Sequence, residues 1–269
     1  MACIGNCYSN SKALIGILAE QHQAHSLIGA AEHVLWPARR VAARVAILHH
    51  RSSNAWDPAG TAKSETQLEY TMCYQADQFG LYLGLAVHGG TAVDFIDETS
   101  LLNVTVMRQY QVLFVAQPNV PTACVRALGA WVHEGGKLVL SAGAAQLDET
   151  NTTDNFLQNT SGVHMASMAR RLLSSGPLPF AAEGNLVNVD GVTGAVKMFG
   201  GTARFTKALP EHTKVLATWN GTDKVQTAAA VETVVGSGAI VHLGWQAGLS
   251  YLVNANSEGT SELRTTNPS

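Results

Sequence analysis

The sequence predicts an α/β fold: a parallel β-sheet with helices on both faces and a C-terminal β-hairpin. Short apolar segments of strand length alternate with amphipathic segments of helix length between residues 44 and 140. A chain of 269 residues is long enough to bury one large core. We therefore expect one α/β domain at residues 41–253, after an N-terminal helical segment at 1–40 and before a disordered tail at 254–269.

The first predicted elements follow from apolar periodicity and from the residues that interrupt it. Residues 11–35 carry apolar side chains at roughly helical spacing, and Pro37 ends that pattern. A compact apolar strand is expected at 44–49. Ser64 is a suitable N-cap for a long helix that Gly89 and Gly90 end.

The middle of the chain continues the alternation of strands with helices. Residues 92–96 and 112–116 are apolar enough for buried strands, and residues 121–134 have the spacing of an amphipathic helix. Gly135 and Gly136 then allow the chain to reverse into a strand at 137–140. Because parallel strands end at one edge of a sheet, the residues that follow them should line that edge.

Beyond residue 150 the pattern is weaker. A polar stretch at 150–194 contains one predicted helix at 163–173. Three strands are expected after it, at 215–218, 226–235 and 239–243, and the glycines around Ser237 join the last two as a hairpin.

The composition points to a partner that covers apolar surface. Hydrophobic residues make up 46% of the chain and charged residues only 14%. Homo-oligomerisation is the simplest such cover. A formal net charge of −3 and an isoelectric point near 6.3 give no basic surface for nucleic acid or an anionic membrane. No segment reaches transmembrane length.

The cysteines favour a reducing compartment, and hence the cytoplasm. There are four, too few and too scattered for a disulfide framework: Cys3, Cys7, Cys73 and Cys124. Four sequons for N-glycosylation would have meaning only in a secreted protein; they begin at Asn103, Asn151, Asn159 and Asn220.

Several short segments occur together in a characteristic order: Val45–Leu48 with Arg51-Ser52-Ser53 and Trp56, Val93–Ile96, Trp131-Val132 with the following glycine pair, and Gly248–Tyr251. In this order they resemble the glutamine-amidotransferase-like trimerisation domain of microbial β-galactosidases and related glycosidases. The resemblance covers roughly residues 40–253. It implies a flavodoxin-like, class I glutamine-amidotransferase-like fold and a trimer. It also implies that the catalytic carboxylates belong to a separate barrel, to which the first helix would be a remnant linker.

The turn after the strand at 137–140 lacks the cysteine that glutamine-amidotransferase-like enzymes use there. Ser141 is the only nucleophilic side chain near this turn, and its surroundings depart from the G-x-S-x-G elbow. Cys73 and Cys124 fall within predicted helices and are expected to pack in the core. We therefore predict no catalytic residue, with Ser141 as the one candidate. The histidines and glycines show no metal or nucleotide-binding motif, so no cofactor is expected.

Four residues at the predicted strand ends are the candidates for a ligand site or an interface: Arg51, Trp56, Asp148 and Glu149. The carboxylates could pair with the arginine, or bind sugar hydroxyls beside the indole. Three hypotheses remain open. The first is a non-catalytic accessory or oligomerisation domain of a glycosidase, which could also form one wall of a sugar site. The second is a small amidotransferase-like hydrolase that uses Ser141 or a displaced cysteine, and the third is a carbohydrate-binding module.

Overall fold

The computed structural model describes residues 11–38, 41–49, 51–56, 62–64, 67–69, 74–169, 185–206, 208–220 and 227–252. The predicted tail at 254–269 lies outside the described residues, as do Cys3, Cys7 and Cys73. The chain divides into two units, residues 1–42 and residues 43–269.

The first unit is helical. Helix α1 spans Ser11–Ala30 and helix α2 spans Glu32–Leu35, so the single helix expected at 11–35 is interrupted at Ala31. Residues 21–30 are exposed along their whole length, including Leu27 at 65% and Ile28 at 57%. The apolar residues at 21–30 therefore pack into no core of this unit among the described side chains.

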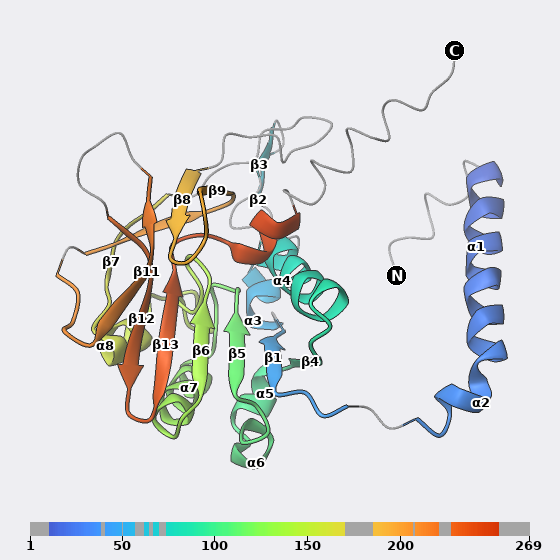
Figure 1. The fold of residues 1–269 in the computed structure, drawn as a ribbon, viewed down its shortest axis with the longest axis horizontal. Helices are drawn as coiled ribbons and strands as arrows, with labels where there is room; N and C mark the ends of the chain where they lie inside the picture. Colours follow the sequence, from blue (N-terminus) through green and yellow to red (C-terminus); the bar gives the residue numbers. More distant parts are fainter. Residues whose placement is uncertain are drawn as a thin grey trace. The chain divides into compact units, whose positions relative to one another are not determined.

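The second unit is built on a nine-stranded sheet in the order β4-β1-β5-β6-β13-β12-β11-β8-β9 (Figure 1). The strands are β4 (Val93–Ile96), β1 (Val45–Leu48), β5 (Val112–Val115), β6 (Lys137–Leu140), β13 (Gly238–Leu243), β12 (Ala228–Val235), β11 (Thr213–Trp219), β8 (Asn185–Val189) and β9 (Ala195–Met198). The first five are parallel and the other four antiparallel. The sheet is therefore mixed, and the prediction of parallel strands holds for one half.

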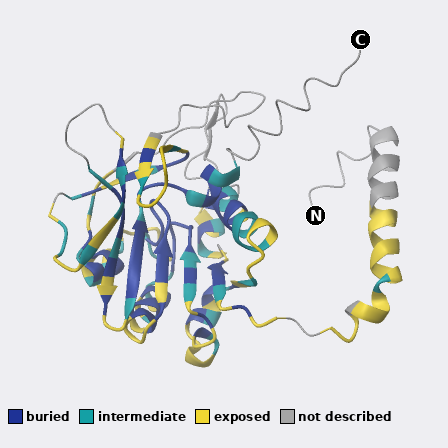
Figure 2. Cartoon of the chain, in the orientation of Figure 1, coloured by how far each residue is buried: buried dark blue, intermediate teal, exposed yellow. Residues whose placement is uncertain are grey.

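Helices pack on both faces of the parallel strands. The helices are α4 (Tyr74–Tyr82), α5 (Glu98–Leu101), α6 (Val104–Met107), α7 (Thr122–His133) and α8 (Phe156–Ser161). Successive strand residues face opposite ways, so Ala46 and Leu48 join one core cluster, while Ile47 joins another with Leu81 of α4. Figure 2 shows that burial is concentrated in the central strands β6 and β13. The predictions of β1, β4, β5, α7 and β6 are confirmed to within about two residues.

The long helix expected from Ser64 to Gly89 is wrong in its first part. Ser64 ends strand β2 (Ala62–Ser64), which pairs with β3 (Gln67–Glu69). Helix α4 continues into a π-helix at Leu83–His88. A π-turn contains more residues than an α-turn and rotates the later side chains away from the expected stripe, so Val87 is 56% exposed.

The polar part of the chain also differs from the prediction. The segment expected to be a helix at 163–173 contains strand β7 (Met165–Ala169), antiparallel to β10 (Thr202–Phe205). Strands β8 and β9 and the helices α8 and α3 (Arg51–Trp56) were not predicted. These elements are short, and pairing with neighbours distant in sequence determines them more than local periodicity does.

Candidate functional site

The carboxyl ends of the parallel strands meet at one edge of the sheet, where the predicted site residues lie. Helix α3 follows β1 directly, so Arg51 begins that helix and Trp56 ends it. Asp148 and Glu149 belong to the loop after β6. Because β1, β5 and β6 are parallel neighbours, these segments emerge at the same edge.

Trp56 and Glu149 are in direct contact at this edge. The indole Nε1–H of Trp56 donates to the backbone oxygen of Glu149 at 3.1 Å. The Glu149 carboxylate accepts from the backbone N–H of Thr122 at 2.8 Å, at the first residue of α7. A carboxylate at a helix N-terminus satisfies an amide that has no partner within the helix. Glu149 therefore positions both a helix and the indole, while Trp56 stays 52% exposed.

Asp148 stabilises its own turn. Its Oδ1 accepts from the backbone N–H groups of Thr150 and Thr152, both at 2.8 Å, and these bonds hold the pKa of Asp148 below its ordinary value. No ion pair joins Arg51 to Asp148 or Glu149 within the described part of the chain. The expected Arg51 pairing is therefore not formed at this edge.

Asp97 is the carboxylate whose pKa the positive charge of Arg51 lowers. Hydrogen bonds from the Ser100 and Thr99 hydroxyls and from the Ser100 amide hold the pKa of Asp97 at about 2, and the positive charge of Arg51 adds to them. Asp97 is the N-cap of α5. The guanidinium thus belongs to the electrostatic surroundings of a helix cap.

A buried network that the prediction missed connects the strand ends. The Glu98 carboxylate, 6% exposed, accepts from the Ser52 backbone N–H at 2.8 Å and from the Ser52 hydroxyl at 2.7 Å. The Asn119 N–H donates to Ser53 Oγ at 2.9 Å, and the Asn119 amide donates to the Asp148 backbone oxygen at 3.2 Å. The only sequence feature that could have indicated the residues of this network is their position directly after strands. These polar groups satisfy one another and fix the loops.

Ser141 follows β6 as predicted but is buried, with 5% exposure. The titratable group beside it is Asp77 of α4, which accepts from the backbone N–H groups of Gly248 at 2.7 Å and Leu249 at 3.0 Å. Burial raises the pKa of Asp77 to about 6, and the nearby Ser141 hydroxyl opposes that rise only in part. A buried hydroxyl beside a carboxyl that resists ionisation is poorly placed to attack a substrate.

Cys124 is equally unsuited to be a displaced nucleophile. Burial raises the pKa of its thiol to about 11, with a contribution from the negative charge of Glu98. The thiol donates to the Glu98 backbone oxygen at 3.2 Å. Among the described residues, no three His, Cys, Asp or Glu side chains cluster in a way that could hold a metal ion. None of the described helices is long and apolar enough to cross a membrane.

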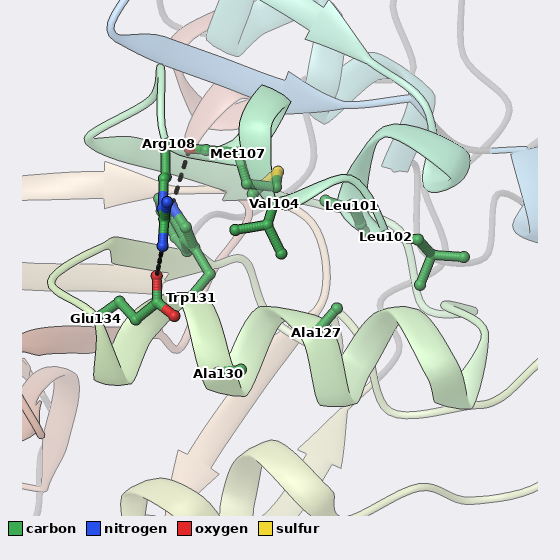
Figure 3. Close-up of a pocket in the computed structure, with 9 residues that line it drawn as sticks. All are labelled: Leu101, Leu102, Val104, Met107, Arg108, Ala127, Ala130, Trp131 and Glu134. Carbon is green, nitrogen blue, oxygen red and sulfur yellow. Dashed lines mark hydrogen bonds and ion pairs between the residues drawn. The ribbon is translucent and has the colours of Figure 1, made fainter.

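An apolar cavity of about 80 Å³ lies between α7 and the helices α5 and α6 (Figure 3). Leu102 and Val104 line this cavity, and 55% and 56% of their respective surfaces are exposed. Arg108 Nη2 and Glu134 Oε2 are 3.8 Å apart at the same cavity. Its size suits one apolar side chain of another protein surface better than a soluble ligand. The sequence analysis did not identify this surface.

Comparisons with known proteins identify the fold. No family model and no curated protein matches this sequence. Among solved structures, the chain is similar to Gan42B, a GH42 β-galactosidase from G. stearothermophilus, with 17% identity and a TM-score of 0.60 over 84% of this chain and 30% of that one. It is also similar to the β-galactosidase from Bacillus circulans sp. alkalophilus, with 15% identity and a TM-score of 0.60 over 83% and 32%.

A third similar structure is named for a different glycosidase activity. It is an exo-β-1,4-mannosidase from Opitutaceae bacterium strain TAV5, with 16% identity and a TM-score of 0.55 over 88% of this chain and 37% of that one. The chain therefore spans about a third of the length of the glycosidases it matches. At these identities the similarity establishes a shared α/β fold.

Proposed function

We propose that this chain is a non-catalytic accessory domain of a glycosidase-type protein, and that it holds subunits or domains together. The observation that carries the proposal is the extent of the fold match: 84% of this chain corresponds to 30% of a GH42 β-galactosidase. A chain that matches part of a larger enzyme along most of its own length fits the role of one domain in such an assembly.

The chemistry at the carboxyl edge supports a non-catalytic role. Ser141 and Cys124 are both buried, and the pKa of the Cys124 thiol is raised rather than lowered. Glu98, Asp148 and Glu149 are engaged in fixing loops and a helix terminus. These contacts leave no exposed pair of a nucleophile and its base among them.

Exposed apolar side chains support assembly. Leu102 and Val104 flank the apolar cavity, and Phe95, beside Tyr82 of α4 on the edge strand β4, is a separate exposed apolar side chain at 48%. Clustered apolar surface on a chain with only 14% charged residues favours contact with another protein surface. We propose homo-oligomerisation, with a trimer as the assembly that the family resemblance implies.

Light scattering on the purified chain tests this proposal. The mass should exceed the 28.5 kDa of one chain, and a trimer would have three times that mass. Val104→Lys should dissociate the assembly with an unchanged circular dichroism spectrum, because an ammonium group would have to be buried at the contact. Val192→Lys, at a position 51% exposed in a different region, is the matched control. A clean monomer of the wild-type chain at tens of micromolar would contradict the proposed assembly.

A carbohydrate contact at Trp56 is the second candidate function. The indole is half exposed while its N–H is already bonded to Glu149, so the ring is held in place with part of its surface free. Trp56→Ala should then abolish any galactoside binding while Arg51→Ala weakens it.

If a purified sample instead hydrolysed esters, glutamine or aryl galactosides, and Ser141→Ala removed that activity, the hydrolase hypothesis would replace the accessory role.

A further inference from the structure

A second hollow, of about 510 Å³, lies between the loop after β6, helix α8 and strand β7. Its lining is composed almost entirely of neutral polar side chains: Gln146, Asn155, Gln158, Asn159, His164 and Ser167. Met165 supplies an apolar wall. Among the described residues that line it there is no Asp, Glu, Lys or Arg, which distinguishes this hollow from the carboxyl edge around Glu98 and Asp97.

Gln158 fixes the orientation of the amide groups that line the hollow. It is 7% exposed, and its Oε1 accepts from the backbone N–H of Met165 at 3.0 Å. A backbone N–H can only donate, so this bond fixes which end of the Gln158 amide is oxygen. Its Nε2 therefore donates, at 3.1 Å to Gln146 Oε1 and at 3.2 Å to Asn155 Oδ1.

This arrangement also determines what the other amides can offer. Gln146 and Asn155 use their oxygens to accept from Gln158, so each has its NH₂ group available as a double donor. The Asn159 side chain makes no hydrogen bond within the described part of the chain, and Asn159 is exposed. The hollow therefore combines several oriented donors with the amide oxygen of Asn159 and the imidazole of His164.

The chemistry of this lining selects the class of ligand. A charged ligand would lose hydration without gaining an opposite charge from the described lining residues, because none of them is acidic or basic apart from the imidazole of His164. A polyhydroxylated ligand offers both acceptors and donors, and its C–H faces can pack against Met165. The volume is within the range of small-molecule sites. We propose that this hollow binds a neutral, polyhydroxylated ligand of the carbohydrate class.

The proposal is independent of the accessory role, because it rests on α8 and β7 and not on Trp56 or on subunit contacts. Asn159 also begins a sequon, Asn-Thr-Ser, whose Ser161 is buried with its hydroxyl 2.9 Å from His242 Nε2. A glycan attached to Asn159 would occupy the hollow, so the test uses protein made without glycosylation.

Amide-resolved nuclear magnetic resonance is the appropriate assay. Methyl β-D-galactoside and maltose, titrated to about 50 mM, should shift the side-chain amide signals of Gln146, Asn155 and Asn159 in a saturable manner, since single sugar sites have weak affinity. Glucose 6-phosphate, a charged sugar, should bind at least about tenfold more weakly. Asn159→Ala and Asn155→Ala should each weaken binding about tenfold with an unchanged melting temperature.

Gln109→Ala, which removes an exposed amide in the turn after α6, is the matched control and should leave the affinity unchanged. Absence of a saturable shift with both neutral sugars would overturn the proposal. So would tighter binding of the phosphorylated sugar, or neutral-sugar binding that survives both asparagine variants. A result of this kind would leave the proposed accessory role intact, because that role is tested by the mass of the assembly.

Discussion

The parallel and antiparallel parts of the sheet differ in how the polar groups beside them are hydrogen-bonded. At the carboxyl edge of the parallel half, Ser52 with Glu98 and Glu149 with Thr122 satisfy one another. In the antiparallel half, the Trp219 indole N–H is buried without a hydrogen-bond partner in the described part of the chain, although its ring packs edge-on against Trp245 at 6.4 Å. The hollow lined by the loop after β6, α8 and β7 leaves the NH₂ groups of Gln146 and Asn155 without a partner in the described part of the chain. Internal hydrogen bonds therefore fix the loops at the carboxyl edge, while the NH₂ groups of Gln146 and Asn155 remain available for a ligand.

Two buried titratable groups, Asp77 and His242, have pKa values shifted in opposite directions. Asp77 packs beside Ser141 at the end of the parallel strands, and burial raises its pKa to about 6. His242 lies on β13, the parallel strand that adjoins the antiparallel half, and burial together with the charge of His164 lowers its pKa to about 4. Acid therefore favours the folded state at one site and opposes it at the other.

The largest expected effect tests whether the parallel half is the scaffold. Leu113 on β5 is fully buried in the main core. Leu113→Ala should lower the free energy of unfolding by about 2–5 kcal/mol, because it removes buried methyl groups and leaves a cavity. Urea denaturation measures this, with Val234→Ala on β12, 60% exposed, as the control at less than about 1 kcal/mol. Equal losses for the two variants would show that Leu113 is not a core residue of the parallel half.

The next effect concerns His242. Its folded pKa lies near 4 against an ordinary 6.5, so the unfolded chain binds the proton more tightly between these values. The stabilising contribution of the neutral imidazole is complete above pH 6.5 and is lost as the pH falls toward 4, by up to about 3 kcal/mol. His242→Gln should abolish this loss, so denaturation between pH 4 and 7 should show the variant gaining on the wild type in acid. A constant difference across that range would show that His242 does not titrate as proposed.

The smallest effect has the opposite sign. The folded pKa of Asp77 is about 6 against an ordinary 3.8, so its contribution to stability is greatest below pH 3.8 and is lost as the pH rises through about 6. Asp77→Asn keeps an oxygen that can accept from Gly248 and Leu249 but carries no charge. It should raise the free energy of unfolding by about 1–3 kcal/mol at pH 7.5 and have little effect at pH 4. Destabilisation at pH 7.5 would mean that the ionised carboxylate is needed for these two bonds.

The N-terminal half of the α/β unit was largely predictable. Residues 45–48, 112–115 and 138–140 are apolar on both faces, as strands covered by helices must be, and glycine pairs mark the ends of the intervening segments. The lack of a cysteine after β6 was also visible in the sequence alone. Gly248 could be recognised as part of a motif, but its reason is tertiary. A Cβ there would strike the backbone of Asp77 and Leu81, so the chain passes close to α4.

The sequence by itself determined the alternation of parallel strands and helices and the four candidates Arg51, Trp56, Asp148 and Glu149. Only the tertiary structure decided their roles. Glu149 caps α7 and holds the Trp56 indole, and the charge of Arg51 lowers the pKa of Asp97, because loops that follow different strands meet at one edge. Strands β7–β10 and the amide hollow at α8 were beyond sequence reasoning. Their segments are short, and the pairing of β7 with β10 and of β8 with β11 joins residues far apart in the chain.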